Sequence, residues 1–203
     1  MFTGIVQGRA TVAGVTDTDG VRALTLQFPP GALTGLTIGA SIAVDGVCLT
    51  AVASDADQAR FDVIDETLAL TTLGALAPDH VVNFERAAAF GDEIGGHLLS
   101  GHVVATVEVV ARTERDANLE LVLRVPADHL KHVLPKGYVA LDGISLTIGR
   151  VEGDTFSVHL IPETRRVTTL DAKRPGDRIN LEVDAMTQAV VATVERVLAQ
   201  RSA

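Results

Sequence analysis

Two residues that can act as nucleophiles stand at the same place in a repeated motif. Residues 45–50 read Asp-Gly-Val-Cys-Leu-Thr and residues 142–147 read Asp-Gly-Ile-Ser-Leu-Thr, so Cys48 and Ser145 are equivalent. A thiol or hydroxyl can add to an electron-poor carbon when a neighbouring group activates it. A lone cysteine in a β-rich chain is more often a small core residue, but the repeated frame and the neighbouring Thr50 favour a reactive site.

One histidine is a candidate for proton transfer. His102 lies between Gly101 and Val103, and its equivalent in the first copy of the motif is Ile5. An ordinary half-buried histidine would also fit this position, but an imidazole pKa near neutrality suits a general acid or base. We interpret His97, a few residues earlier, as structural.

Metal and nucleotide sites are not predicted. His129 and His132 are three residues apart, but no cysteine or convincing further ligand lies near them in the sequence. The glycine-rich residues 91–101 lack the spacing of a dinucleotide-binding or phosphate-binding loop. The sequence therefore predicts chemistry without a metal or another cofactor.

The motif belongs to a longer duplication. The two copies lie 97 residues apart (142 − 45), and sliding residues 1–86 over 98–183 at that offset makes about 25 of 86 positions identical without a gap. A repeat of this length is a whole domain and not a solenoid unit. We expect one domain at residues 1–96, a second at 97–185, and a terminal segment at 186–203.

Composition restricts the ligand class. Of 203 residues, 47% are hydrophobic and 21% charged, which indicates a folded chain, and no apolar run is long enough to span a bilayer. The net charge of -9 and the absence of a Lys/Arg cluster argue against nucleic acid and anionic membranes as partners. A single cysteine and an N-terminus without a secretion signal predict a cytoplasmic protein that binds a small molecule.

Short β-rich runs separated by turn signals must position these residues. Many short strands with few helical patterns indicate antiparallel barrels or sandwiches. We predict an all-β fold of two tandem, internally duplicated six-stranded Greek-key antiparallel barrels plus a C-terminal α-helix. The expected strands lie within residues 24–28, 41–52, 60–64, 119–125, 138–148 and 155–161.

Four segments have helical character. Residues 30–37 and 127–134 could each form one turn, and residues 87–90 could form a short helix in the linker. Residues 186–200 have the apolar spacing of an amphipathic helix, with Asp184 placed to cap it. The apolar stripe of this helix could pack against its own chain or against a neighbouring subunit.

The chain resembles the riboflavin synthase family. The resemblance is carried by residues 1–6, by residues 95–103 and by the two copies of the motif, and it extends over all 203 residues. It implies a transferase that dismutates two molecules of 6,7-dimethyl-8-ribityllumazine without a cofactor, each barrel binding one of them. It also implies a homotrimer held by the C-terminal helices, with the working site between barrels of two subunits, and it leaves lumazine synthase open as a further partner.

The resemblance also implies which residues form the site. Catalytic roles fall to Cys48, His102, Ser41, Phe2, Ser145 and Asp184, although Asp184 could be only a helix cap. In the first copy, the substrate-binding residues are Gly4, Ile5, Val6, Cys48, Leu49, Thr50, Asp62, Val63, Ile64, Asp65, Glu66 and Thr67. In the second copy, they are Gly101, His102, Val103, Lys136, Ser145, Leu146, Thr147, Leu160, Ile161, Pro162, Glu163, Thr164 and Arg165.

Two function classes stay open at this point. An enzyme needs the polar set that differs between the copies, in which Cys48 faces Ser145 and Ile5 faces His102. A carrier that only binds lumazine or flavin could lose several of these residues, and a purely structural double barrel would need none. The difference between the two copies fits a reaction in which one lumazine donates a four-carbon unit to the other. The sequence leaves open which pocket holds the donor.

Overall fold

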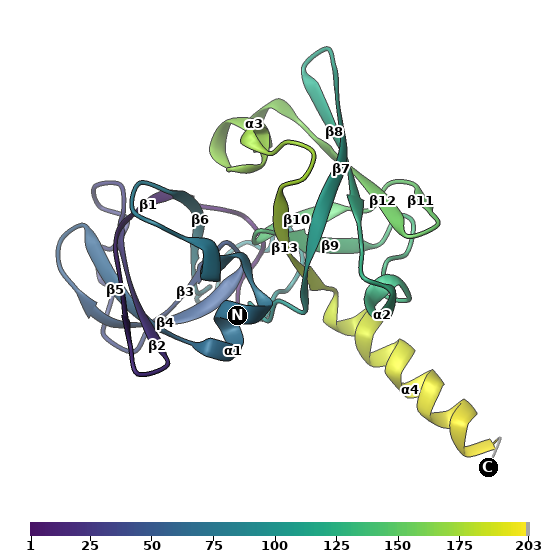
Figure 1. Ribbon diagram of the computed structural model, residues 1–203, viewed down its shortest axis with the longest axis horizontal. Coiled ribbons are helices and arrows are strands. Elements are labelled where there is room, and N and C mark those ends of the chain that lie inside the picture. The colour runs from purple at the N-terminus through teal and green to yellow at the C-terminus, as the bar shows by residue number, and fades with distance from the viewer. Residues whose placement is uncertain (202–203) are drawn as a thin grey trace.

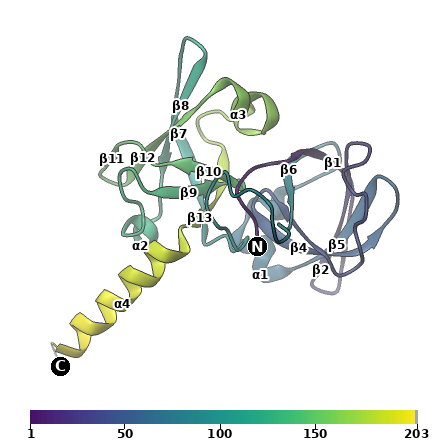
Figure 2. The ribbon, with the colours of Figure 1, turned by 180° about the vertical axis from the view of Figure 1, so that it is seen from behind.

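Two β-domains lie side by side, and a long helix extends from the second (Figures 1 and 2). The computed structural model describes residues 1–201, so the last two residues of the predicted terminal segment, 202–203, lie outside the described residues. The first repeat consists of β1 (Gly8–Thr18), β2 (Val21–Gln27), β3 (Ser41–Val44), β4 (Val47–Ser54), β5 (Gln58–Ile64), α1 (Asp65–Leu70), the 3-10 turn η1 (Thr72–Ala75) and β6 (Val81–Arg86).

The second repeat follows the same order. It consists of β7 (Ala105–Arg115), β8 (Asn118–Arg124), α2 (Ala127–Leu130), β9 (Tyr138–Leu141), β10 (Ile144–Thr147), β11 (Val151–Glu152), β12 (Thr155–Leu160), α3 (Pro162–Val167), η2 (Leu170–Ala172) and β13 (Arg178–Val183). The terminal helix α4 (Ala185–Arg201) comes last. These elements confirm the predicted fold class of two β-repeats and a C-terminal helix.

The repeated Asp-Gly pairs are the turns of two tight hairpins. Asp45 and Gly46 join β3 to β4 with φ values of 42° and 79°, and Asp142 and Gly143 join β9 to β10 with 45° and 82°. A two-residue hairpin turn of this kind needs positive φ at both positions, which Asp and Gly tolerate better than most residues. The motif therefore sets the register of the strands that carry Cys48 and Ser145.

The two sheets close differently. In the first repeat six strands form a closed barrel in the order β1-β2-β5-β4-β3-β6. The second repeat forms a seven-stranded sheet in the order β10-β9-β13-β7-β8-β12-β11, because the segment equivalent to β4 is divided into β10 and β11. At the division, Gly149 N donates to Ser157 O at 2.7 Å, so the chain still follows the path of a barrel.

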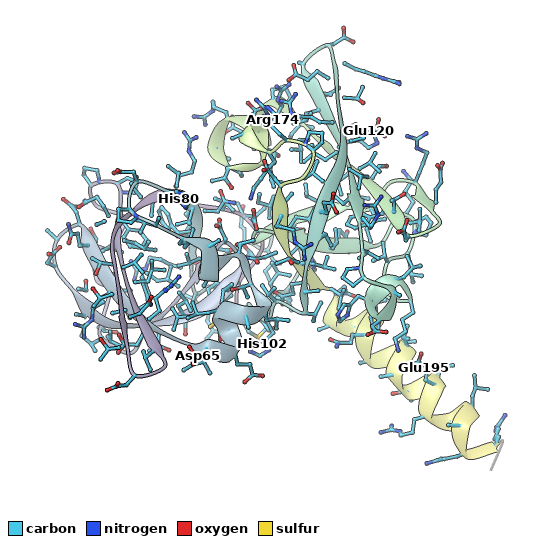
Figure 3. The ribbon with its side chains drawn as sticks, in the orientation of Figure 1. Asp65, His80, His102, Glu120, Arg174 and Glu195 are labelled. Atoms are coloured by element: carbon cyan, nitrogen blue, oxygen red, sulfur yellow. The ribbon has the colours of Figure 1, made fainter. Side chains whose placement is uncertain are left out.

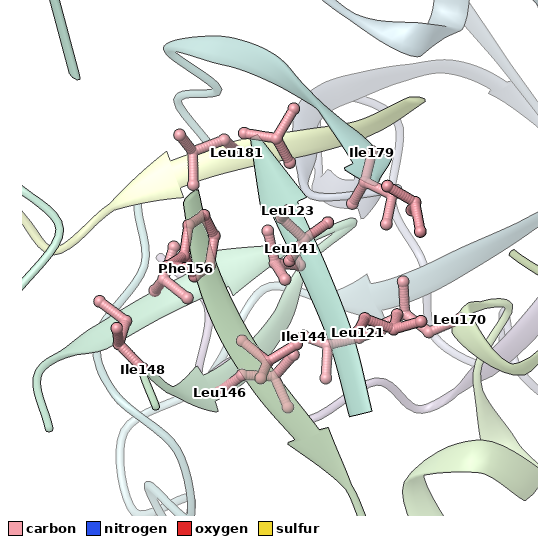
Figure 4. Packing of buried hydrophobic residues seen from close by; sticks show 14 of the residues in the cluster. Leu121, Leu123, Leu141, Ile144, Leu146, Ile148, Phe156, Leu170, Ile179 and Leu181 are labelled. Atoms are coloured by element: carbon pink, nitrogen blue, oxygen red, sulfur yellow. The ribbon is translucent and has the colours of Figure 1, made fainter. Parts of the chain in front are cut away.

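Alternating burial gives each repeat a hydrophobic core. In β5, Ala59, Phe61 and Val63 are buried while the residues between them point outwards, which is the period of a half-buried strand. In the second repeat, Leu121, Leu141 and Phe156 meet from different strands of the sheet (Figure 4). Burial of such side chains from water supplies most of the driving force for folding.

The repeats contact one another around an approximate two-fold axis. Phe2 N donates to Leu99 O at 2.8 Å and Leu99 N donates to Phe2 O at 3.0 Å, and the two residues are equivalent in the repeat. The Asn83 amide likewise accepts from Thr169 N at 2.8 Å, while the equivalent Asn180 amide accepts from Thr72 N at 2.8 Å. The interface within the chain is thus self-complementary, as in a two-fold dimer.

Two of the short helices expected from the sequence do not form. Residues 30–37 form turns in which Gly31 and Gly35 have positive φ, which a helix cannot accommodate, whereas 127–130 is helical as expected. Residues 87–90 are also not helical. The backbone N–H groups of Ala87 and Ala88 donate to Ser41 O and Met1 O, so they are not available for helical hydrogen bonds.

The terminal helix α4 is confirmed, with Asp184 as its cap. Asp184 Oδ2 accepts from Thr187 N at 2.8 Å and from Thr187 Oγ1 at 2.7 Å, which satisfies a free backbone donor of the first turn. None of the described residues of α4 is buried in the single chain, and Val190 and Val194 are 56% and 51% exposed. Lys131 Nζ reaches the helix through an ion pair with Glu195 at 2.7 Å.

Candidate functional site

The first candidate ligand site, called the first pocket from here on, is the seam where strands β4 and β5 separate. Residues 51–54 of β4 pair with residues 59–61 of β5. Beyond that point residues 47–50 pair with β3 alone and residues 62–64 pair with β2 alone. The open edges offer backbone donors and acceptors to a ligand. The structure therefore brings two predicted binding segments, 48–50 and 62–64, to one seam.

An equivalent seam exists in the second repeat. Strand β10 pairs with β9 alone, and β12 pairs with β8 along its length and with β11 only at its start. The predicted segments 145–147 and 160–165 begin on the two edges of this opening. Each repeat thus carries one seam in the same place, as a protein with two similar ligand sites requires.

The segments that lead into each repeat cross to the other one. Gly101 O accepts from Cys48 N at 2.9 Å, and Gly4 O accepts from Ser145 N at 2.9 Å. Val103 packs in the core of the first repeat, and Val6 packs against the core of the second. The grouping of residues 4–6 with the first barrel and of 101–103 with the second was therefore wrong. Each seam is therefore bordered by a segment that leads into the other repeat.

Two buried glutamates hold the crossing segments. Glu85 accepts from Thr3 N at 2.6 Å, from Thr3 Oγ1 at 2.7 Å and from Gly4 N at 3.0 Å. The equivalent Glu182 accepts from Ser100 N and Ser100 Oγ, both at 2.8 Å. Burial raises the pKa of Glu85, and the hydrogen bonds from Thr3 and Gly4 oppose that shift. The equivalence of Glu85 and Glu182 was visible in the sequence, but their role was missed.

Cys48 lies at the edge of the first pocket. It is half-buried and packs against a small cluster that contains Phe2, Ala43 and Leu99. Phe2 is 1% exposed, so it is a buried plug beside Cys48 and not a ring at an open edge. Ser41 lies opposite Thr50 in the β3–β4 ladder. The predicted catalytic residues Cys48 and Phe2 are thus brought together.

His102 joins the first pocket through the crossing. It is exposed and follows Gly101, whose carbonyl accepts the hydrogen bond from Cys48 N. Figure 3 labels His102, which follows the residue that accepts from Cys48 N of the first repeat. The predicted proton-transfer residue therefore lies with the thiol and not with Ser145.

Ser145 has a partner that the sequence did not suggest. His97 Nδ1 lies 2.7 Å from Ser145 Oγ, and the His97 ring stacks on Tyr138 with centroids 5.1 Å apart. Burial lowers the pKa of His97, and the charges of Asp184 and Glu182 oppose that shift. A neutral imidazole therefore lies against the hydroxyl of the second pocket.

Lys136 lies beside a cavity at the divided strand. The cavity has a volume of about 460 Å³, and Glu120, Arg150 and His159 also line it. Lys136 has a φ of 67°, an uncommon value for a residue with a side chain, and its N–H donates to Ile148 O at 2.9 Å. Arg150 pairs with Glu120 at 2.9 Å. The second seam therefore ends among cationic side chains.

The remaining predicted binding residues are spread more widely. Ile64 and Ile161, at the N-terminal ends of α1 and α3, are 54% and 60% exposed. Glu163 pairs with Arg166 at 2.6 Å on the surface, and Arg165 Nε donates to Asp171 at 2.6 Å. Arg165 is therefore directed towards η2 and not towards Ser145.

Basic residues gather between the repeats, contrary to the expectation that the chain has no Lys/Arg cluster. A cleft of about 1210 Å³ is lined by Arg165, Arg166, Lys173, Arg174 and Arg178. Acidic side chains of both repeats line the same cleft, and several of the basic groups are bonded within the chain. These contacts offset part of the positive charge of the cluster.

The described residues contain neither a cluster of metal ligands nor a helix that could span a membrane. Across residues 1–201, no three or more His, Cys, Asp or Glu side chains gather as a metal site would require. The helices among these same residues are all too short or too polar to cross a membrane.

Known proteins share this arrangement. The family model described as the lumazine binding domain matches twice, at residues 3–87 and 100–184. The chain is 48% identical over 202 residues to riboflavin synthase from Escherichia coli (strain K12), which covers 99% of this chain and 95% of that protein. It is 45% identical over 199 residues to riboflavin synthase from Chlamydia pneumoniae, with 98% of both chains covered.

Solved structures with the same fold contain ligands. LumP complexed with 6,7-dimethyl-8-(1'-D-ribityl) lumazine has a TM-score of 0.82 at 25% identity, covering 91% of this chain and 99% of that chain. LumP complexed with riboflavin has a TM-score of 0.84 at 26% identity, covering 91% and 100%.

Proposed function

We infer that this chain, which belongs to the riboflavin synthase family, is a transferase that dismutates 6,7-dimethyl-8-ribityllumazine. Two lumazine molecules give riboflavin and 5-amino-6-(D-ribitylamino)uracil, the last step of riboflavin biosynthesis. The observation that carries this function is the pair of equivalent seams, one per repeat, each with a thiol or hydroxyl at its edge. A reaction between two copies of one substrate needs two similar pockets.

We propose that each seam holds one lumazine. The complexes of LumP with ribityl lumazine and with riboflavin support this proposal, because the same double fold binds both kinds of ring. The first pocket would use residues 48–50, 62–67 and 101–103. The second would use residues 145–147, 160–164 and 4–6, with Lys136 at its end.

Orientation supplies much of the catalysis in this proposal. Holding two rings face to face converts a bimolecular encounter into an oriented one, which can lower a barrier by roughly 7–11 kcal/mol. Loss of a proton from the methyl group on C7 leaves an anion that spreads into the conjugated ring, so nearby donors stabilise it. His102, Thr50 and Thr147 are the groups we assign to this task. Cys48, Ser41 or a bound water would be the nucleophile that adds to the acceptor ring.

We propose that the two rings meet between subunits of a homotrimer. The chain exposes apolar side chains near both seams, such as Ile5 at 50%, Ile64 at 54% and Ile161 at 60%. It also exposes the apolar stripe of α4. Exposed apolar groups that cluster around a site are typical of surfaces covered by a partner or ligand. We also propose that the protein is cytoplasmic and that its domain boundaries lie at residues 96 and 185.

One assay tests the function. Purified protein mixed with the lumazine should develop riboflavin fluorescence, whereas a chain that only binds lumazine should change the lumazine spectrum without forming riboflavin. Replacing Val190, Val194 and Val197 with Asp tests the trimer, because charge in the stripe should give smaller species by light scattering. Activity should fall with that change. A fully active monomer would refute the site between subunits.

A further inference from the structure

The second pocket contains a hydrogen bond that the first pocket lacks. Ser145 Oγ lies 2.7 Å from His97 Nδ1, and His97 itself is 8% exposed. Its other ring nitrogen, Nε2, has no hydrogen-bond partner within residues 1–201. The bond to Ser145 is therefore the one hydrogen bond that the His97 ring makes within the described residues.

The backbone beside His97 is shaped to allow this contact. A Cβ on Gly96 would lie 2.7 Å from Ser145 Cβ and 2.3 Å from Thr3 O, so only glycine lets the chain approach so closely. On the other side, Tyr138 stacks on the imidazole with an interplanar angle of 21°. The stacking on Tyr138 and the close approach at Gly96 hold the imidazole beside Ser145, and its hydrogen bond orients the hydroxyl.

Duplication did not produce an equivalent of His97. The aligned copies, residues 1–86 and 98–183, offer no counterpart of His97, because His97 lies just before the second copy. Cys48, which stands where Ser145 stands, has no hydrogen bond to its sulfur within the described part of the chain. Ser41 stands where Tyr138 stands and has no ring to stack. The difference between the pockets is therefore one of orientation as well as of residue type.

A held hydroxyl behaves differently from a free one. A serine hydroxyl rotates about its C–O bond and can donate once and accept twice. With one direction occupied by His97, the remaining directions are fixed in space, and a ligand in the seam meets a preorganised group. The imidazole is neutral because burial disfavours its charged form, so it can hold the hydroxyl without an ion pair.

We propose that His97 is a positioning residue for the dismutation, and that it holds Ser145 Oγ towards the lumazine in the second pocket. This inference rests on the proposed function. It makes the second pocket the one with a fixed polar group at the reacting ring, while the thiol of the first pocket stays free to adjust. Ser145 touches substrate in this scheme, and His97 acts only through Ser145.

The test separates the ring of His97 from its hydrogen bond. His97→Phe keeps a ring for Tyr138 and loses the bond, so we expect kcat to fall about tenfold while KM changes by less than about twofold. His97→Asn places an amide near the position of Nδ1 and should recover most of kcat. Ser145→Ala should lose at least as much kcat as His97→Phe, and the double variant should fall no further than Ser145→Ala.

His80→Phe is the matched control. His80 is exposed, its Nδ1 accepts from Ala77 N at 3.3 Å, and it precedes β6 on the first repeat, outside the predicted binding segments (Figure 3). That variant should keep the kcat of the parent chain. An unchanged kcat in His97→Phe, or losses in His97→Phe and Ser145→Ala that multiply in the double variant, would overturn the positioning role alone. A parent chain that forms no riboflavin would overturn the proposed function, and this inference with it.

Discussion

The first repeat closes its barrel through one continuous strand, β4, whereas the second divides the equivalent strand into β10 and β11. The division comes after Thr147, so the part that carries Ser145 keeps the geometry of the part that carries Cys48. Only the distal end differs. The two repeats thus share the hairpin that holds Cys48 or Ser145, and they differ in the strand that follows it.

The distal end also differs in charge. In the second repeat, Lys136, Arg150 and His159 line the cavity at the division. The equivalent residues of the first repeat are Gly39, Ala53 and Asp62. Two pockets with the same backbone frame therefore offer different surroundings to identical substrates. A donor and an acceptor of one chemical type can be told apart only by such surroundings.

The largest expected effect comes from removing the second repeat. Residues 1–96 alone contain one seam but lose the Gly101 carbonyl that binds Cys48 N and the groups that bind Asn83. A second copy can replace all of them, because the interface is two-fold in character. We expect this half to form a dimer that binds lumazine and has little or no synthase activity.

Light scattering and fluorescence titration check this expectation. Asn83→Leu should weaken the dimer, since the Asn83 amide donates to Asp142 O at 3.1 Å and accepts from Thr169 N in the full chain. A half-chain that unfolds, or one that binds no lumazine, would contradict the idea of two autonomous binding domains.

The next largest effect concerns the one lysine that breaks the symmetry of the interface. Lys173 Nζ lies 3.0 Å from Asp142 Oδ2, whose residue is fully buried, while the equivalent of Lys173 in the first repeat is Leu76. Removing one partner of a buried ion pair typically costs about 3–5 kcal/mol. Lys173→Met should therefore lower the free energy of unfolding by about 3 kcal/mol in urea melts.

Two further variants test whether the loss comes from an uncompensated buried charge. Asp142→Asn added to Lys173→Met should restore much of the loss, because the uncompensated charge is then gone. Lys131→Met breaks the exposed pair with Glu195 and should cost less than about 1 kcal/mol. Equal losses in Lys173→Met and Lys131→Met would show that the buried pair has no special role.

Much of this architecture could be predicted from the sequence, for a physical reason. Local β-rich runs predict most of the strands within residues 21–64 and 118–160, whereas β1, β6, β7 and β13 lie outside the expected ranges. The Asp-Gly turns follow from the φ values that a two-residue hairpin needs. The gapless offset of 97 residues then makes Cys48 and Ser145 equivalent, and the structure places both at the edge of a seam.

Several of the features that escaped prediction depend on distant contacts. An alignment of the copies pairs Gly4 with Gly101 but cannot tell on which repeat either one packs. The helix expected at residues 87–90 is lost to hydrogen bonds with residues far away in the sequence. His97 lies outside the first copy of the repeat, so its bond to Ser145 has no counterpart from which it could be inferred.

A smaller effect should appear as pH dependence of stability. Burial and the nearby charge of Asp142 raise the pKa of Asp45 well above its usual range. The folded state then binds more protons than the unfolded state between the unfolded pKa of about 3.9 and the higher folded value. Stability contributed by this group is present at acidic pH and is lost as pH rises through that window.

Asp45→Asn removes this dependence. An amide oxygen can still accept from Asn83 N, which donates to Asp45 Oδ1 at 2.7 Å in the parent chain. We expect the variant to be more stable than the parent by about 1 kcal/mol at pH about 8, with the difference shrinking towards pH about 4. Urea melts across that range measure it. A gain that grows as pH falls would contradict the sign.

The smallest effect should come from making the two pockets alike. Cys48→Ser gives the first seam the hydroxyl of the second, and the β3–β4 hairpin that carries it is the counterpart of the one that carries Ser145. If a hydroxyl can replace the thiol as the group that adds to the acceptor ring, turnover should fall only a few fold. Cys48→Ala removes the group and should lose more.

Measuring turnover and lumazine binding for both variants separates the chemical role of Cys48 from a packing role. Cys48 packs against Phe2 and Ala43, so a packing role predicts that Ala and Ser, which are both smaller, weaken binding to a similar degree. A chemical role predicts that Ser keeps turnover while Ala does not, at nearly equal binding. If Cys48→Ala matched the parent in turnover, the thiol would have no part in the reaction, and the difference between the pockets would lie in His97, Lys136 and their neighbours instead.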